Sequence, residues 1–79
     1  MAKPIRIKQF ISFSGTTIAA TAENYRHDAE QYSAVLPTIM GWAANAATVH
    51  DVEAYAGQAF IYARAAAHSG RMALELANR

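Results

Sequence analysis

The chain has 79 residues, a net charge of +1 and no cysteine. This length allows one domain at most, so we treat residues 1–79 as a single domain whose own hydrophobic core is marginal. Without cysteine, neither a disulfide framework nor a cysteine-containing zinc site can form. The near-neutral charge argues against a polyelectrolyte-type nucleic-acid binder, because such binding depends on many Lys and Arg contacts with phosphates.

Charged residues make up only 16% of the chain, whereas hydrophobic residues make up 53%. So little charge cannot cover the surface of a small protein in the usual way, which predicts that another chain covers part of it, as in a homodimer or larger homo-oligomer. Residues 31–49 lack charge, but Pro37, Gly41 and many alanines leave them less apolar than a membrane span. The N-terminus lacks the apolar segment of a signal peptide, so we expect a soluble cytoplasmic protein without a membrane partner.

Residues 4–13 alternate between apolar and polar side chains, which predicts a β-strand within an arm formed by residues 1–15. Ile5, Ile7, Ile11 and Phe13 would share one face of it. No second strand candidate follows, and a single strand leaves its backbone hydrogen bonds unsatisfied. We therefore expect this strand to pair with its copy in a second subunit. The alternatives are that it pairs with a strand of another protein, or that these residues form an extended or helical segment before the first helix.

Three helices are predicted in the remaining residues 16–79, over about 17–36, 38–47 and 49–77. The Ser and Thr residues between 12 and 17 offer caps for the first helix, and Pro37 must break the helical path because it removes a backbone hydrogen bond. Thr38 can then cap the short second helix. The fold class is thus mainly α, a short N-terminal strand followed by three helices in a small bundle that oligomerisation completes.

The long helix over 49–77 has the clearest pattern. Thr48 and Asp51 have the spacing of a capping box at its start. Small apolar residues recur along it at alternating spacings of three and four, a seam that lets a neighbouring helix approach closely. This seam predicts packing against the first helix or against the same helix of a second copy. Its members are Val49, Val52, Ala56, Ala59, Ala63, Ala66, Gly70, Ala73 and Ala77.

A His-Asp-x-Glu-x-Tyr pattern occurs twice, and it could place His27 and Glu30 on one helix and His50 and Glu53 on another. Such pairs can converge on a metal in a four-helix bundle, but the order is the reverse of the usual Glu-x-x-His and supporting glutamates are few. We favour a coincidence of surface residues, or a duplicated helical unit, over a metal site. We find no phosphate-binding loop and no nucleophile elbow, so we expect no enzyme and no cofactor.

The favoured function is therefore a noncatalytic protein–protein interaction module, such as an adaptor, an assembly component or a small inhibitor of the kind encoded by phages and mobile elements. Its partner-binding candidates are the aromatic residues Trp42, Tyr55, Phe60 and Tyr62, since aromatics dominate interface energetics. The alternative is a dimeric DNA-binding regulator or antitoxin that inserts Arg6 and Lys8 from a two-stranded ribbon. In its order of elements the chain resembles ribbon-helix-helix regulators.

Overall fold

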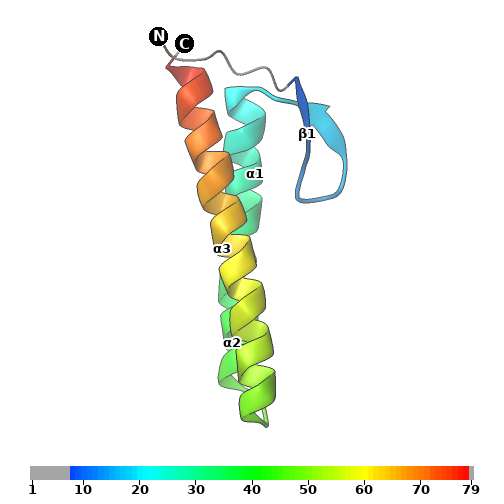
Figure 1. Ribbon diagram of the computed structural model, residues 1–79, viewed down its shortest axis with the longest axis vertical. Coiled ribbons are helices and arrows are strands. Elements are labelled where there is room, and N and C mark those ends of the chain that lie inside the picture. Colours follow the sequence, from blue (N-terminus) through cyan, green and yellow to red (C-terminus); the bar gives the residue numbers. More distant parts are fainter. Residues whose placement is uncertain (1–7, 79) are drawn as a thin grey trace.

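The computed structural model describes residues 8–78, which form a helical hairpin with a small β-hairpin against one side (Figure 1). Helix α3 (Val49–Ala77) runs the whole length of the molecule, and α1 (Ala22–Ala34) and α2 (Leu36–Ala44) follow one another beside it. The shortest extent is 15 Å, so the described part of the chain has no third layer of helices over the pair. None of the described helices is long and apolar enough to cross a membrane.

The N-terminal strand pairs within its own chain, which corrects the prediction that it pairs between subunits. Strand β1 (Gln9–Ile11) runs antiparallel to β2 (Thr17–Ala19), with Phe10 opposite Ile18. Gly15 reverses the chain between them with a φ of +84°, a conformation that side-chain-bearing residues rarely adopt. The predicted strand residues Ile5 and Ile7 lie outside the described residues.

The first helix starts later than predicted, because residues 17–19 belong to β2. Its N-cap is Thr21, whose Oγ1 accepts a hydrogen bond from the Asn24 backbone N–H over 3.1 Å. The break near Pro37 is confirmed: α1 ends before Val35, and Pro37 occupies the first turn of α2, where its missing N–H has no cost. Thr38 therefore lies inside α2 and does not cap it, and α2 ends at Ala44 rather than at residue 47.

Helix α3 spans the predicted residues 49–77. Its N-cap is Thr48, whose Oγ1 accepts a hydrogen bond from the Asp51 backbone N–H over 3.1 Å, as the capping-box spacing predicts. Asp51 also places an acidic group in the first turn, where the helix dipole favours negative charge.

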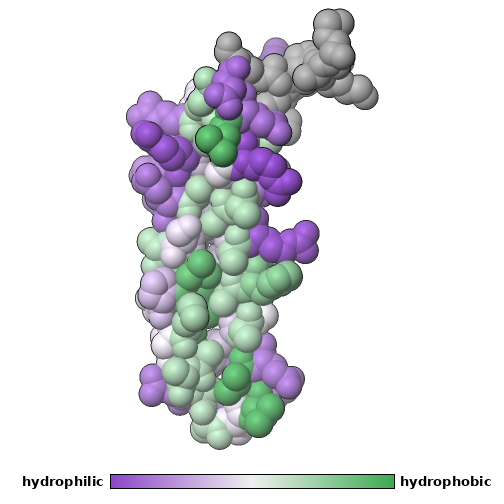
Figure 2. All heavy atoms as spheres, turned by 90° about the vertical axis from the view of Figure 1, so that its left-hand side faces the viewer, coloured by the Kyte–Doolittle hydropathy of each residue, from purple (hydrophilic) through white to green (hydrophobic). Residues whose placement is uncertain are grey.

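The core of the single chain is small. Among the described apolar residues only Tyr25 and Ile39 are buried, and Ser12, Asp28 and Ser69 are buried polar residues. Eight large apolar side chains stay exposed: Ile11, Met40, Trp42, Val49, Val52, Phe60, Ile61 and Leu74. Figure 2 shows the face opposite the β-hairpin, where apolar residues run along most of the length and hydrophilic residues gather at the upper end. The chain thus buries little of its apolar surface by itself.

Candidate functional site

The α1–α3 pair has two sides, and the β-hairpin covers one of them. Phe10 of β1 stacks on Tyr25 of α1, with ring centroids 4.0 Å apart. Phe13, in the loop after β1, packs edge-on against Tyr32 of α1 and also contacts Tyr62 of α3. These aromatic contacts hold the hairpin against both helices and leave the opposite side of the pair free.

A buried carboxyl group joins the same three elements. Asp28 of α1 is 3% exposed; its Oδ1 accepts a hydrogen bond from the Phe13 backbone N–H over 2.6 Å, and its Oδ2 accepts one from the Ser69 hydroxyl over 2.9 Å. Burial, and secondarily the negative charge of Asp28, raise the pKa of the Tyr25 and Tyr32 hydroxyls. Both oxygens of Asp28 are thus satisfied by structural donors, so we assign this group to the fold rather than to chemistry.

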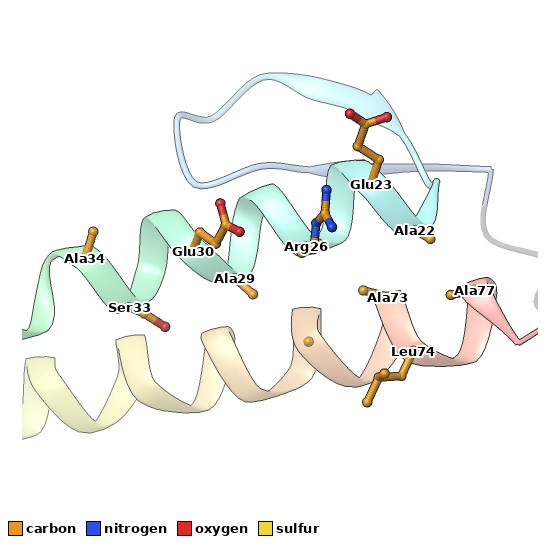
Figure 3. A pocket seen from close by; sticks show the side chains of 11 residues that line it. Ala22, Glu23, Arg26, Ala29, Glu30, Ser33, Ala34, Ala73, Leu74 and Ala77 are labelled. Carbon is orange, nitrogen blue, oxygen red and sulfur yellow. The ribbon is translucent and has the colours of Figure 1, made fainter.

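The free side of the α1–α3 pair contains a groove of about 920 Å³ (Figure 3). Its floor is built from small residues: Ala22, Ala29 and Ser33 of α1 point toward α3, and Ala73 points back toward α1. Without large side chains on this floor, a neighbouring helix can approach the backbone of both helices closely. The lining residues are Ala22, Glu23, Arg26, Ala29, Glu30, Ser33, Ala34, Gly70, Ala73, Leu74 and Ala77.

Charged residues follow the outer edge of the groove on α1. Glu23, Arg26 and Glu30 line the groove, and in Figure 3 their side chains point away from α3. On the opposite edge, Leu74 of α3 is 66% exposed and points away from α1. The groove therefore has an apolar floor, one charged edge and one apolar edge, an arrangement typical of a protein contact surface.

The predicted seam of small residues lies partly on this groove. Gly70, Ala73 and Ala77 line it, whereas Ala56 and Ala63 are exposed nearer the other end of α3. Most of the buried and half-buried residues of α3 follow a stripe that shares Ala59, Ala66 and Ala73 with the seam but alternates these small residues with larger ones. That stripe comprises Tyr55, Ala59, Tyr62, Ala66, Ser69, Ala73 and Leu76, all of them buried or half-buried.

Two of the four predicted partner-binding aromatics, Trp42 and Tyr62, line a second hollow, which we call the Trp42 hollow, and a third, Tyr55, packs beside Trp42. It has a volume of about 270 Å³, and its lining residues are Ala34, Val35, Thr38, Ile39, Trp42, Gln58 and Tyr62. Trp42 is 52% exposed, and its ring centroid lies 5.8 Å from that of the half-buried Tyr55. Tyr62 separates this hollow from the β-hairpin, because it also contacts Phe13.

The fourth aromatic, Phe60, lies apart from the Trp42 hollow. It is 63% exposed, and the guanidinium of Arg64 lies 5.8 Å from its ring centroid. This distance is within the range of a cation–π contact between neighbouring turns of one helix. Phe60 therefore belongs to a separate exposed part of α3, where the structure gives it no role in either concave surface.

The structure does not bring together the four residues of the hypothetical metal site. His27 and Glu30 lie on α1 near the height of Ser69, whereas His50 and Glu53 lie at the start of α3, roughly 28 Å away at 1.5 Å per residue. No group of three or more His, Cys, Asp or Glu side chains among residues 8–78 is placed to hold a metal ion.

The DNA-binding alternative gains no support from the described hairpin. Lys8 precedes β1 and is the sole basic residue between positions 8 and 21, while Arg6 lies outside the described residues. The ribbon is formed by β1 and β2 of one chain, so these strands do not need the dimeric ribbon of that hypothesis to pair their backbone groups.

In the comparisons with known proteins, no family model, curated protein or solved structure matches the chain.

Proposed function

We propose that the chain is a noncatalytic protein–protein interaction module, which binds a protein partner at the Trp42 hollow. Adaptor, assembly component and small inhibitor are the roles that fit such a module. The observation that carries this proposal is the exposure of Trp42: the single tryptophan of the chain is 52% exposed beside a concave, largely apolar surface.

A half-exposed tryptophan at a hollow is well suited to anchor a partner. Its two side-chain torsions cost little entropy to fix, and its large ring supplies contact area with one polar N–H. Because Trp42 is 52% exposed, a partner that covers it removes a large part of this ring from water. The Trp42 hollow thus combines an anchor residue with a recess that receives a side chain of the partner.

The size of the hollow favours a protein partner over a small molecule. Small-molecule pockets commonly measure about 300–1,000 Å³ and enclose their ligand, whereas this recess of about 270 Å³ is open and lies between two helices. The lining also contains no charged residue and offers the polar groups of Thr38, Gln58 and Tyr62 around an apolar floor. One apolar side chain from a partner, surrounded by polar contacts, fits this chemistry.

Affinity capture from the native host with immobilised chain tests the proposal. We expect the wild-type chain and Ile11→Ala to retain the same partner, and Trp42→Ala to lose it. Ile11 is the matched control, because it is a large apolar residue that is 70% exposed and lies on β1, away from the hollow. Equal retention by Trp42→Ala, with circular dichroism showing that it is folded, would exclude the Trp42 hollow as the binding surface.

A further inference from the structure

The groove between α1 and α3, with a volume of about 920 Å³, is larger than the Trp42 hollow and shares one lining residue with it, Ala34. We infer that its occupant is a second copy of this chain, related by a twofold axis that places α1 antiparallel to α1 of the partner. This inference goes beyond the proposed function, since it assigns a second helical face of the same module to self-association.

The charges along the groove are complementary to their own twofold image. In an antiparallel pair of identical helices, the numbers of facing residues have a constant sum, and a twofold axis at position 28 makes that sum 56. Arg26 of each copy then faces Glu30 of the other, which forms two opposite-charge contacts. The same register places Glu23 opposite Ser33 and Ala22 opposite Ala34, so none of these pairs joins like charges.

A twofold axis at the level of position 28 is also compatible with close packing of the two α3 helices. Asp28 and Ser69 are joined by a hydrogen bond of 2.9 Å, so position 28 of α1 lies level with the Ser69–Gly70 region of α3. Gly70 lines the groove, and a Cβ built on it would find open space within 4 Å. The two α3 helices would therefore meet where their side chains are smallest, and a close crossing of this kind favours packing of helix backbones.

The interface predicted in this way is modest in size. The 13 residues of α1 overlap over ~20 Å, and the β-hairpin already covers the other side of the α1–α3 pair. Interfaces at the low end of the size range belong to weak or transient complexes, so we expect dissociation in the micromolar range. Of the residues that line the Trp42 hollow, Ala34 belongs to this overlap, whereas Trp42 lies beyond it on α2 and stays available to the protein partner.

Charge reversal tests the register, because the two single variants should fail alone and succeed together. In Arg26→Glu, two pairs of glutamates face each other across the axis, and in Glu30→Arg two pairs of arginines do so. We expect each variant to dimerise at least tenfold more weakly than wild type in sedimentation equilibrium. An equimolar mixture should recover dimers of near wild-type affinity, since every cross-axis contact in the heterodimer joins opposite charges. Both residues are exposed, and circular dichroism checks that each variant folds.

Each outcome decides the inference. A monomeric wild-type chain throughout the micromolar range, unweakened single variants, or a mixture that fails to recover dimers would overturn it; a helix of another protein would then be the candidate occupant. The proposed function fails separately. Trp42-dependent capture with a monomeric chain refutes only self-pairing, whereas dimers without Trp42-dependent capture refute only the partner site.

Discussion

The hydrogen bonds of Asp28 predict a large loss of stability when this carboxyl group is removed. Asp28→Ala leaves the Phe13 backbone N–H and the Ser69 hydroxyl without their acceptor in a buried place. Hydrogen bonds to a carboxylate contribute about 1.5–3 kcal/mol each, so we expect the loss of both to cost roughly 3–6 kcal/mol. A domain of this size has about 5–15 kcal/mol in total, and the β-hairpin should detach first because Phe13 belongs to its loop.

Urea unfolding at fixed protein concentration, followed by circular dichroism, measures this loss. Ser69→Ala removes one of the two donors and should cost about 1.5–3 kcal/mol, while Asp28→Asn keeps one acceptor oxygen and should fall between Ser69→Ala and Asp28→Ala. The double variant Asp28→Ala with Ser69→Ala should lose less than the sum of the single losses, by on the order of 1 kcal/mol. A loss below about 0.5 kcal/mol for Asp28→Ala, or strict additivity in this cycle, would refute the reasoning.

Three further predictions concern single features of the fold. The raised pKa of Tyr25 and Tyr32 means that folding favours the protonated form of both hydroxyls. Their contribution to the free energy of unfolding should be complete below the ordinary pKa of 10.0 and should decrease as the pH rises through the pKa of the folded state. A urea midpoint that does not change with pH across this range would contradict this prediction. Gly15→Ala should cost ~1 kcal/mol in urea unfolding because φ is +84° there, even though a Cβ would meet no atom within 4 Å. Thr48→Ala removes the cap of α3 and should also cost ~1 kcal/mol, whereas Thr48→Ser should restore most of it.

The long helix was the most predictable element, since its pattern extends over eight turns and its start carries a capping residue. Thr48 and the spacing of Asp51 located the first turn, and the small-residue periodicity persisted to residue 77. The break at Pro37 was equally predictable, because proline cannot continue a helix without losing a hydrogen bond. Such local rules need no knowledge of the tertiary structure.

The β-hairpin could not be predicted in the same way. Strand β2 has three residues, too few to show an alternating pattern, and the Ser and Thr residues before it are equally suited to capping a helix. What favours the hairpin is tertiary: Phe10 stacks on Tyr25, and the Phe13 N–H reaches Asp28 fifteen residues away. Gly15 and Asn24, whose side-chain amide donates to the Ala19 carbonyl over 2.9 Å, were the available local indications.

The candidate surfaces were predictable in part. Aromatic composition pointed to Trp42 and Tyr62, which line one hollow, and to Tyr55, which packs beside Trp42, but also to Phe60, which lies apart from them. The α1 side of the groove was missed, because Ala22, Ala29 and Ser33 form a recess only beside the small residues of α3. Asp28 was also missed as a buried residue, since aspartate is rarely buried and only the folded hairpin supplies its donors.

The central claim is that the Trp42 hollow binds a protein, and site-specific photo-crosslinking in the native host tests it most directly. A photo-crosslinking phenylalanine derivative would replace the exposed Thr38, which lines the hollow beside Trp42, in one chain and the exposed Ile11 in another. The account predicts a discrete covalent adduct with a protein partner from position 38 and none from position 11. Equal adducts from both positions, or no adduct from position 38, would contradict it.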